Sequence, residues 1–245
     1  MQNSKNFKYS GVSEKFNMEV MKNYNNHIFE IGLNYFKKEK KCIDFGAGIG
    51  TLSLIFREKF NINPVCVEID KENIEYLKKR KFKFFKNLKN APSQNDLIFS
   101  SNVLEHIEDD QSTLNLMKKK LKKNGILYLF LPAKMLLWSQ MDEAVGHYRR
   151  YEYKEIKMKC ESAGFKIKTI HYVDCIGFFA SLTLKFFGYN ANNGLGSRKS
   201  IKFYDKYIFP FSKKLDFVGF KYLFGKNLLI IAKKKIICVI YTVTP

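Results

Sequence analysis

The chain has 245 residues, is 46% hydrophobic and carries a formal net charge of +20 at pH 7, which allows a sizeable core in one large α/β domain or two small ones. The positive charge would suit a nucleic acid or an anionic membrane, but all except five of the 43 basic residues are lysines spread along the chain, as AT-rich codon usage would also produce. No apolar stretch reaches the roughly 20 residues that span a bilayer, and the polar first residues are unlike a signal peptide, which predicts a cytoplasmic protein.

A helical cap is expected over residues 1–40. Between residues 12 and 38, apolar side chains recur at helical spacing, at Val20, Met21, Tyr24, Ile28, Ile31 and Leu33. The helix is expected to cover the first strand of a sheet, with Tyr24 and Asn25 packed in the core.

The rest of the chain is organised around residues 41–53. The apolar run Cys42 to Phe45 ends in the closely spaced glycines Gly46, Gly48 and Gly50, and an amphipathic stretch follows, which predicts a strand, a tight turn and a helix. Glycine adopts positive φ readily and lets a ligand approach the main chain, so the turn is a candidate nucleotide site. Dinucleotide sites use Gly-x-Gly-x-x-Gly, whereas the third glycine here comes one residue early, so the turn fits a ligand without a pyrophosphate.

A second strand is expected at residues 64–67, directly before Glu68, Ile69 and Asp70. An acidic residue about 20 positions beyond the glycine turn is placed to accept hydrogen bonds from ribose hydroxyls, which makes Glu68 the candidate ribose ligand and leaves Asp70 to cap the next helix. A short third strand is expected within residues 81–87, a fourth at 97–100, and a helix from about Asp110 to Lys123.

Three segments resemble, in order and spacing, the motifs of the class I S-adenosylmethionine-dependent methyltransferases: Ile43 to Gly50, Val67 to Asp70 and Asp96 to Ile107. The resemblance runs from about residue 20 to about residue 235. It implies a doubly wound α/β fold with a mostly parallel sheet of seven strands, the last antiparallel, and S-adenosylmethionine as the cofactor. The cofactor-binding residues that it implies are Asp44, Gly46, Ala47, Gly48, Gly50, Glu68, Ile69, Asn87 and Asn102. In that family N-terminal helices help to close over the cofactor, which is an alternative role for Tyr24 and Asn25.

His106, in the loop after the fourth strand, is a candidate general base, because an imidazole can take a proton from a hydroxyl or an amine near neutral pH. The alternative is that it orders the loop by hydrogen bonding. The similar O-methyltransferases of quinone biosynthesis carry Glu-x-x-Glu-His here and can hold a divalent metal, but Asn102 replaces the first Glu, so no metal is expected. The five cysteines are scattered without a Cys-x-x-Cys pair and are expected to be reduced thiols.

After an apolar fifth strand at residues 125–131, residues 135–151 combine the only Trp with a Gly, a His and two Arg, a mixture more typical of ligand binding than of packing. This stretch resembles the Gly-His-x-Arg-x-Tyr segment that lines the acceptor pocket of small-molecule and glycan-associated methyltransferases. The resemblance assigns Trp138, His147 and Arg149 to acceptor binding, with His147 as the rival base. Trp138 could instead close the core, and Arg150 is expected to pair with acids on the surface.

Residues 175–218 form a helical insertion before the last strand, which is expected at 227–232. Its first part is apolar on nearly all sides but too short to span a membrane, and a Gly/Asn/Ser linker at 190–200 follows. Residues 201–215 predict a basic amphipathic helix, with Tyr204, Tyr207, Ile208 and Phe211 on one stripe and Lys202, Lys206, Lys213 and Lys214 opposite. We expect a lid packed against the acceptor pocket, or a peripheral contact with the inner membrane surface. The apolar tail at 236–245 has no functional account.

The resemblance therefore predicts a single methyltransferase domain over residues 1–245, which we expect to methylate an oxygen of a small or lipid-linked acceptor. The Asn/Asp-Pro-Pro-Tyr/Phe tetrapeptide of many amino-group methyltransferases acting on nucleic acid is absent after the fourth strand, where Ser101 to Leu104 stands instead. Two alternatives stay open. One is an RNA methyltransferase that uses the positive charge, and the other is a nucleotide-binding oxidoreductase of the same fold class.

Overall fold

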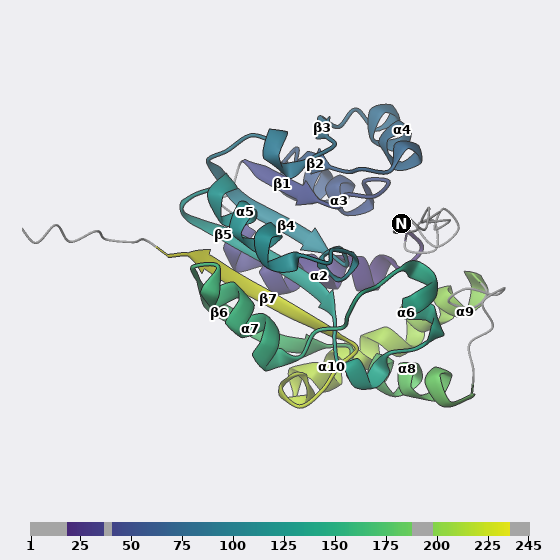
Figure 1. Ribbon diagram of the computed structural model, residues 1–245. Helices are drawn as coiled ribbons and strands as arrows, with labels where there is room; N and C mark the ends of the chain where they lie inside the picture. Colours follow the sequence, from purple (N-terminus) through teal and green to yellow (C-terminus); the bar gives the residue numbers. More distant parts are fainter. Residues whose placement is uncertain (1–18, 37–40, 188–197, 236–245) are drawn as a thin grey trace, which may run out of the picture.

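A seven-stranded sheet lies at the centre of the molecule (Figure 1). The computed structural model describes residues 19–36, 41–187 and 198–235. The strand order is β3-β2-β1-β4-β5-β7-β6. Neighbouring strands are parallel, except that β7 runs antiparallel to β5 and β6. The prediction of seven strands with an antiparallel last strand is confirmed. The strands are β1 (Cys42–Phe45), β2 (Val65–Val67), β3 (Phe84–Phe85), β4 (Asn95–Ser101), β5 (Leu121–Pro132), β6 (Phe165–Val173) and β7 (Asn227–Lys234).

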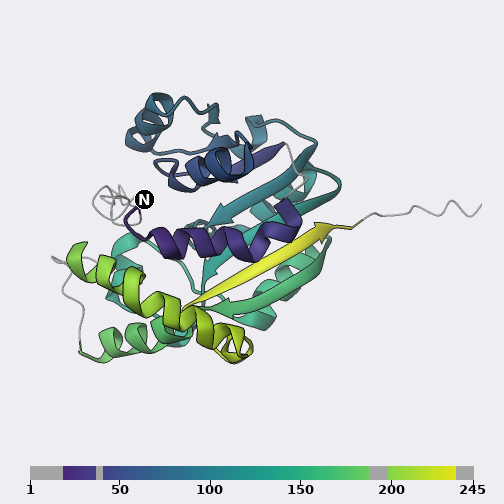
Figure 2. The ribbon, with the colours of Figure 1, turned by 180° about the vertical axis from the view of Figure 1, so that it is seen from behind.

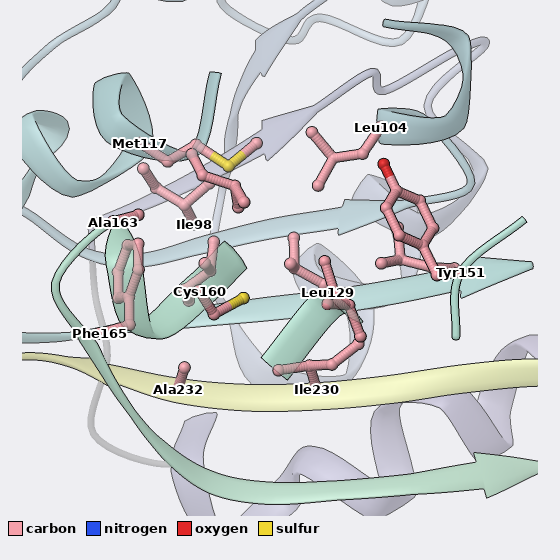
Figure 3. Close-up of a cluster of buried hydrophobic side chains, with 14 of the residues drawn as sticks. Ile98, Leu104, Met117, Leu129, Tyr151, Cys160, Ala163, Phe165, Ile230 and Ala232 are labelled. Carbon is pink, nitrogen blue, oxygen red and sulfur yellow. The ribbon is translucent and has the colours of Figure 1, made fainter. Parts of the chain in front are cut away.

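Helices cover both faces of this sheet because its central strands are apolar on both sides. On one face, α2 and α10 pack with α3 against Phe99 and Tyr128, and Figure 2 shows α2 and α10 crossing that face. On the other face, α5 and α7 cover a cluster that includes Ile98, Leu129 and Ile230 (Figure 3). The helices are α2 (Lys22–Phe36), α3 (Thr51–Phe60), α4 (Lys71–Lys79), α5 (Asp110–Lys120), α6 (Gln140–Val145), α7 (Tyr153–Ser162), α8 (Cys175–Phe187), α9 (Arg198–Phe203) and α10 (Phe209–Phe217).

The predicted element boundaries need three adjustments. The third strand is only two residues long, and α5 ends at Lys120 rather than Lys123 because residues 121–124 extend β5. Asn124 takes a left-handed φ of 65° within that extension, and the pairing of β4 with β5 shifts register between Asn95 and Leu97. In the described part of the predicted cap, α2 begins at Lys22, and Tyr24 and Asn25 are both buried, as expected; residues 1–18 and 37–40 of the cap lie outside the described residues.

The neighbouring strands β1 and β4 mark the point where the strand order reverses, the place at which open α/β sheets bind ligands beyond the carboxyl ends of the strands. The glycine turn follows β1, and the loop with Asn102 and His106 follows β4. The two segments are in close contact, because a Cβ on Gly46 would lie inside the Val103 side chain. Two motifs that are about 55 residues apart in sequence therefore meet at this edge, as the predicted topology requires.

Buried aspartates fix the helical insertion to the sheet. Asp216 on α10 accepts hydrogen bonds from the backbone N–H groups of Asp174 and Cys175 at the start of α8, at 2.7 and 3.2 Å. Asp205, in the π-helical turn η5 (Tyr204–Ile208) between α9 and α10, accepts from the backbone N–H groups of Asn23 and Tyr24, at 3.0 and 2.9 Å. The insertion is thus bonded both to the end of β6 and to the N-terminal helix.

The stripe predicted for the second insertion helix does not lie on one face of the observed helix, since Tyr204 and Ile208 are half-buried and the other two residues are exposed. Tyr207 and Phe211 are 56% and 57% exposed, and the buried positions are Ile201, Asp205, Phe209, Ser212 and Asp216. The physical reason is the pair of buried aspartates, whose backbone partners turn this polar face inward, together with the π-helical turn that precedes Pro210. Proline has no N–H for the regular helical bond to residue 206, and the wider turn shifts the stripe.

Over the described residues, none of the helices is long and apolar enough to cross a membrane. Much of the predicted linker, together with the tail at 236–245, lies outside the described residues.

Candidate active site

The three glycines of the turn after β1 all have left-handed backbone angles, with φ of 76°, 56° and 86° at Gly46, Gly48 and Gly50. At Gly46 the absent side chain lets the loop of Val103 approach, and at Gly50 it makes room for Leu77 and Phe82. At Gly48, by contrast, no described atom lies within 4 Å of the position that a Cβ would take. Gly48 therefore leaves its main chain open to a ligand, whereas its two neighbours serve packing.

Glu68 lies at the carboxyl end of β2 and is bonded to the glycine turn. Its Oε2 accepts a hydrogen bond from the backbone N–H of Gly48 at 2.7 Å, and its Oε1 accepts from those of Ile69 and Asp70 at 2.9 Å each. The side chain is only 8% exposed, and Asp70 caps α4 as predicted by accepting from the N–H of Asn73. The carboxylate is thus held in one position beside the open main chain of Gly48.

Two further predicted cofactor residues lie along the same edge. Ile69 is 78% exposed, an unusual position for an isoleucine beside a buried carboxylate, and offers an apolar surface to a flat ligand. Asn87, two residues beyond β3, is exposed and caps the short helix η1 (Leu88–Asn90) by accepting from the N–H of Lys89. Ala47, inside the turn, is buried.

Asp44 lies in β1 below the turn and faces α3, where the Ser53 hydroxyl donates a 2.6 Å hydrogen bond to its Oδ2. Burial raises the pKa of the Asp44 carboxyl to about 7, with the Ser53 hydrogen bond opposing this shift and the Glu68 charge adding to it. Asn102 follows β4 with a φ of 52°, a conformation that asparagine tolerates, and its N–H donates to the carbonyl of Phe130 on β5. Asn102 thus joins the loop to the adjacent strand.

Two predicted bases, His106 and His147, come together from different loops. Their ring centroids are 4.6 Å apart at an interplanar angle of 73°. The His106 ring is hydrogen-bonded to the backbone of Val145 and Gly146, and burial, with the neighbouring His147, lowers its pKa to about 4. His106 is therefore neutral at physiological pH.

His147 is held by Asp142, a residue that the sequence-based prediction missed. His147 Nδ1 lies 2.7 Å from Asp142 Oδ1, which also accepts from Arg150 Nε at 2.8 Å. Burial alone would raise the pKa of the Asp142 carboxyl, but hydrogen bonds from His147 and Arg150 outweigh it and lower the pKa. An ionised carboxylate can only accept a hydrogen bond, so His147 Nδ1 is the donor in this contact, and Nε2 is the ring nitrogen that Asp142 does not engage.

The expected surface position of Arg150 is wrong. Arg150 is 7% exposed, and its guanidinium pairs with Asp142, the same carboxylate that contacts His147. The physical reason is that a buried carboxylate requires a paired charge, which the second arginine of the Arg149–Arg150 pair supplies. Asp142 had a recognisable signal in the sequence, since Ser139 lies three residues before it and the two form a capping box at the start of α6.

Glu105 completes this cluster, which consists of Glu105, His106 and His147. Its side chain is fully buried, neither carboxyl oxygen has a hydrogen-bond partner among the described residues, and its Oε1 lies 3.9 Å from His147 Nε2. Burial raises the pKa of this carboxyl to about 8, against the opposing effect of Arg150. Ligand atoms of the three residues all lie within 4.8 Å of one another, a set that could hold a metal ion.

The other two predicted acceptor residues form their hydrogen bonds with groups outside this cluster. Arg149 pairs with Asp110 at 2.7 Å and donates to the carbonyl of Glu108, which ties the loop to the start of α5. Trp138 is partly exposed, and its indole N–H donates to Glu143 at 3.3 Å. Of the residues assigned to the acceptor, His147 is the one that joins the candidate base.

Comparison with known proteins bears on the family. A protein-family model for a methyltransferase domain matches residues 21–170, more than half of the chain. The chain belongs to that methyltransferase family. None of the curated proteins matches it.

The methyltransferase also shares its fold with many solved structures. A methyltransferase dependent on S-adenosylmethionine (SAM) from Archaeoglobus fulgidus superposes with a TM-score of 0.57 at 20% identity, over 87% of this chain and 94% of that one. A phosphoethanolamine N-methyltransferase from Haemonchus contortus, in complex with SAM, gives 0.55 at 16% identity over 86% and 52% of the two chains. A cyclopropane synthase from Mycobacterium tuberculosis gives 0.56 at 15% identity over 84% of each. At these identities the similarity shows the fold and leaves the acceptor open.

The protein is a SAM-dependent methyltransferase, and the residues at the carboxyl ends of β1 and β2 fit this cofactor. Gly48 leaves open space beside its main chain, Glu68 offers a fixed carboxylate, and Ile69 offers an exposed apolar side chain. These are the contacts that a ribose-bearing ligand with an aromatic base requires. The family assignment thus decides against the nicotinamide-dependent alternative.

Proposed function

We propose that this methyltransferase methylates a hydroxyl oxygen of a small or lipid-linked acceptor, with His147 as the general base. The observation that carries the proposal is the 2.7 Å contact between His147 Nδ1 and the buried carboxylate of Asp142. A neutral amine can attack an electrophilic methyl group with its own lone pair, whereas a hydroxyl becomes a good nucleophile only as it loses its proton. A histidine oriented by a carboxylate supplies that proton transfer.

The cofactor site proposed here uses the residues predicted from the sequence. SAM, when bound, supplies a methyl group on a sulfonium that is open to displacement. Glu68 accepts from one ribose hydroxyl, Ile69 packs against the adenine, and Asn87 lies beyond β3. Gly46, Ala47, Gly48 and Gly50 form the turn, and Asp44 and Asn102 support it from β1 and the loop after β4. What supports these roles is the open main chain of Gly48, the carboxylate of Glu68 bonded beside it and the exposed side chain of Ile69.

His147 is the stronger of the two candidate bases. Asp142 accepts from its Nδ1, which leaves Nε2 free to take a proton and stabilises the imidazolium that results. His106 has its pKa lowered to about 4 by burial and by His147 itself, so it is a weak base. We assign His106 the role of holding the His147 ring in place, through the 4.6 Å contact between their centroids.

The acceptor is proposed to lie between the loop after β4 and the loop after β5, where these histidines meet. Much of the catalysis would come from alignment, with the acceptor oxygen about 3 to 3.5 Å from the methyl carbon. Arg149 and Trp138 are the remaining acceptor-binding candidates. Because Arg149 pairs with Asp110, it would bind an acceptor only by exchanging that partner.

The test is a comparison of His147→Gln with wild type on a panel of phenols, polyprenylated phenols and primary amines, measured as S-adenosylhomocysteine formation. We expect turnover on a hydroxyl acceptor to fall by on the order of a hundredfold or more in the variant. Affinity for S-adenosylhomocysteine, measured by calorimetry, is expected to stay unchanged, and His171→Gln on β6 serves as the control histidine. Transfer to amines only, or full activity of His147→Gln on a hydroxyl, would contradict the proposal.

An RNA acceptor is the alternative, and the net charge of +20 is the observation that favours it. RNA binding whose affinity falls steeply with salt, together with methylation of RNA and of none of the small acceptors, would replace the proposal with this alternative.

A further inference from the structure

Apolar side chains that are exposed to solvent gather on one part of the molecule, the helical insertion and the turn that follows it. Most of the large apolar side chains that are exposed in the described chain belong to residues 179–223. These side chains are Phe179, Leu184, Phe186, Phe203, Tyr207, Phe211, Phe217, Val218, Phe220, Tyr222 and Leu223. Figures 1 and 2 both show α8, α9 and α10 side by side along one edge of the molecule.

The continuous helix from Arg198 to Phe217 presents an ordered row of these side chains. Phe203, Tyr207, Phe211, Lys214 and Val218 are all exposed and follow one another at steps of three or four residues, which places them on one helix face. We name this row the outer stripe. The opposite positions are the buried ones that bond to α2 and to the end of β6. The outer stripe therefore points away from the protein because its opposite face is fixed inward.

The exposed charges of the segment that carries the outer stripe are positive, and one of them, Lys213, pairs with the exposed Glu30 on α2. Between residues 175 and 226 the sequence contains two acidic residues, Asp205 and Asp216, against nine basic ones. Both aspartates are buried and accept backbone hydrogen bonds. Lys202, Lys206 and Lys214, by contrast, are exposed on the same helix as the outer stripe.

We propose that the outer stripe docks this enzyme on an anionic membrane surface. Aromatic and aliphatic side chains interleaved with lysines are the composition of helices that lie in a lipid interface, with the apolar side chains in the headgroup region and the lysines among lipid phosphates. Large exposed apolar patches mark interaction surfaces, since water solvates them poorly.

Two other occupants fit the surface less well. Single-stranded RNA would use the aromatic rings, but Val218 and Leu223 offer no ring on which a base could stack, and the segment has a single arginine. A second copy of this chain would bring the same row of lysines against itself, so that like charges would oppose one another. An anionic lipid surface satisfies the apolar and the basic side chains together.

The experiment is co-sedimentation of the full chain with vesicles of phosphatidylcholine alone and with vesicles of phosphatidylcholine and phosphatidylglycerol in equal parts. We expect binding to the anionic vesicles, little binding to the neutral ones, and a fall in binding as salt rises. Replacing both aromatics, in Tyr207→Ser/Phe211→Ser, is expected to weaken binding at least about tenfold. Reversing charge, in Lys202→Glu/Lys214→Glu, is expected to weaken it about fivefold per lysine removed or more.

The matched control carries one apolar and one charge change on α7, on the opposite face of the sheet. Met158→Ser/Lys154→Glu alters two exposed residues of that helix and is expected to bind like wild type. Each variant must also keep the wild-type affinity for S-adenosylhomocysteine, which shows that it is folded. The charge-reversal pair tests the proposal separately if the serine pair does not fold.

Four results would overturn the proposal. The first is equal binding of the outer-stripe variants and wild type to anionic vesicles. The second is the absence of wild-type binding at low salt. The third is a wild-type dimer in sedimentation velocity that the serine pair turns into a monomer, which would make the outer stripe an interface between copies of this chain. Competition by polyuridylate that the serine pair abolishes would assign the surface to RNA instead.

Discussion

The ribose role of Glu68 can be tested quantitatively because the structure shows how much of its carboxylate is already used. A carboxylate has about four acceptor positions, and three of them receive backbone N–H groups, those of Gly48, Ile69 and Asp70. The remaining position, on Oε2, is available to one hydroxyl. A hydrogen bond to a charged group contributes about 1.5 to 3 kcal/mol, so one such bond corresponds to roughly ten- to a hundredfold in affinity.

The perturbation is Glu68→Gln, which keeps the size of the side chain and one oxygen. Its amide NH₂ would face either the N–H of Gly48 or those of Ile69 and Asp70, so the variant loses part of the backbone bonding together with the ribose bond. Loss of affinity alone would therefore not distinguish a ribose ligand from a group that only orders the turn. Glu72→Gln, an exposed acid one residue into the first turn of α4, controls for the change in charge.

The assay that separates these two effects is a titration with S-adenosylhomocysteine and with its 2′-deoxy and 3′-deoxy analogues. Wild type is expected to bind at least one deoxy analogue ten- to a hundredfold more weakly than the parent, whereas Glu68→Gln should discriminate little between them. The comparison measures the coupling between the side chain and the hydroxyl, in which any effect on the turn cancels. If Glu68→Gln rejects the deoxy analogues as strongly as wild type does, Glu68 does not bind the ribose and the reasoning fails.

Three further predictions concern the same site. Gly46→Ala and Gly48→Ala both place a Cβ on a left-handed backbone and should lower the melting temperature, but Gly46→Ala should lower it further because its Cβ would enter the Val103 side chain. Gly48→Ala should in addition weaken S-adenosylhomocysteine binding, because its Cβ would enter the open space beside the turn, and equal effects of the two variants on both properties would contradict this division. Glu105→Gln should gain stability relative to wild type as pH rises from about 5 to about 8. Burial raises the pKa of the folded Glu105 carboxyl to about 8, so the folded protein keeps a proton that the unfolded chain releases, which costs wild type on the order of 1 kcal/mol per pH unit. Melting temperatures of the two proteins that change in parallel across that range would refute the prediction. Dialysis against a chelator should leave turnover unchanged, since the His147–Asp142 pair suffices for proton removal; loss of turnover that zinc restores would instead make Glu105, His106 and His147 metal ligands.

The cofactor half of the site could be predicted from the sequence because its contacts are local in the chain. The glycine turn, the acid after β2 and the cap at Asp70 each depend on a short pattern whose geometry follows from backbone preferences. The boundaries that were wrong, as in β3 and α5, depend on pairing with a neighbouring strand, which no local pattern records. The parallel order of the sheet followed from the resemblance and from alternating strands and helices.

The acceptor half could not be predicted to the same depth because its contacts depend on burial and long-range pairing. Arg149 and Arg150 are adjacent and chemically alike, yet one pairs with Asp110 on α5 and the other is buried against Asp142. In the same way, Tyr207 and Phe211 fit the predicted stripe by their spacing but are exposed, because two aspartates that bond to distant backbone groups hold the opposite face inward. A hydrophobic pattern therefore indicates a helix here but not which of its faces packs inward.

The insertion at 175–218 lies beyond residues 21–170, the part of the chain that the family model matches. The insertion contacts the loop after β5 directly, since Lys185 on α8 donates a 2.7 Å hydrogen bond to the carbonyl of Leu136 in that loop. This hydrogen bond therefore connects the proposed docking surface on α8 and α10 to the loop that carries His147. If the acceptor is lipid-linked, docking at the outer stripe would bring the acceptor and the base to the same side of the molecule. Anionic vesicles should then speed up methylation of the lipid-linked acceptor. Soluble analogues of that acceptor should be methylated equally fast with and without the vesicles.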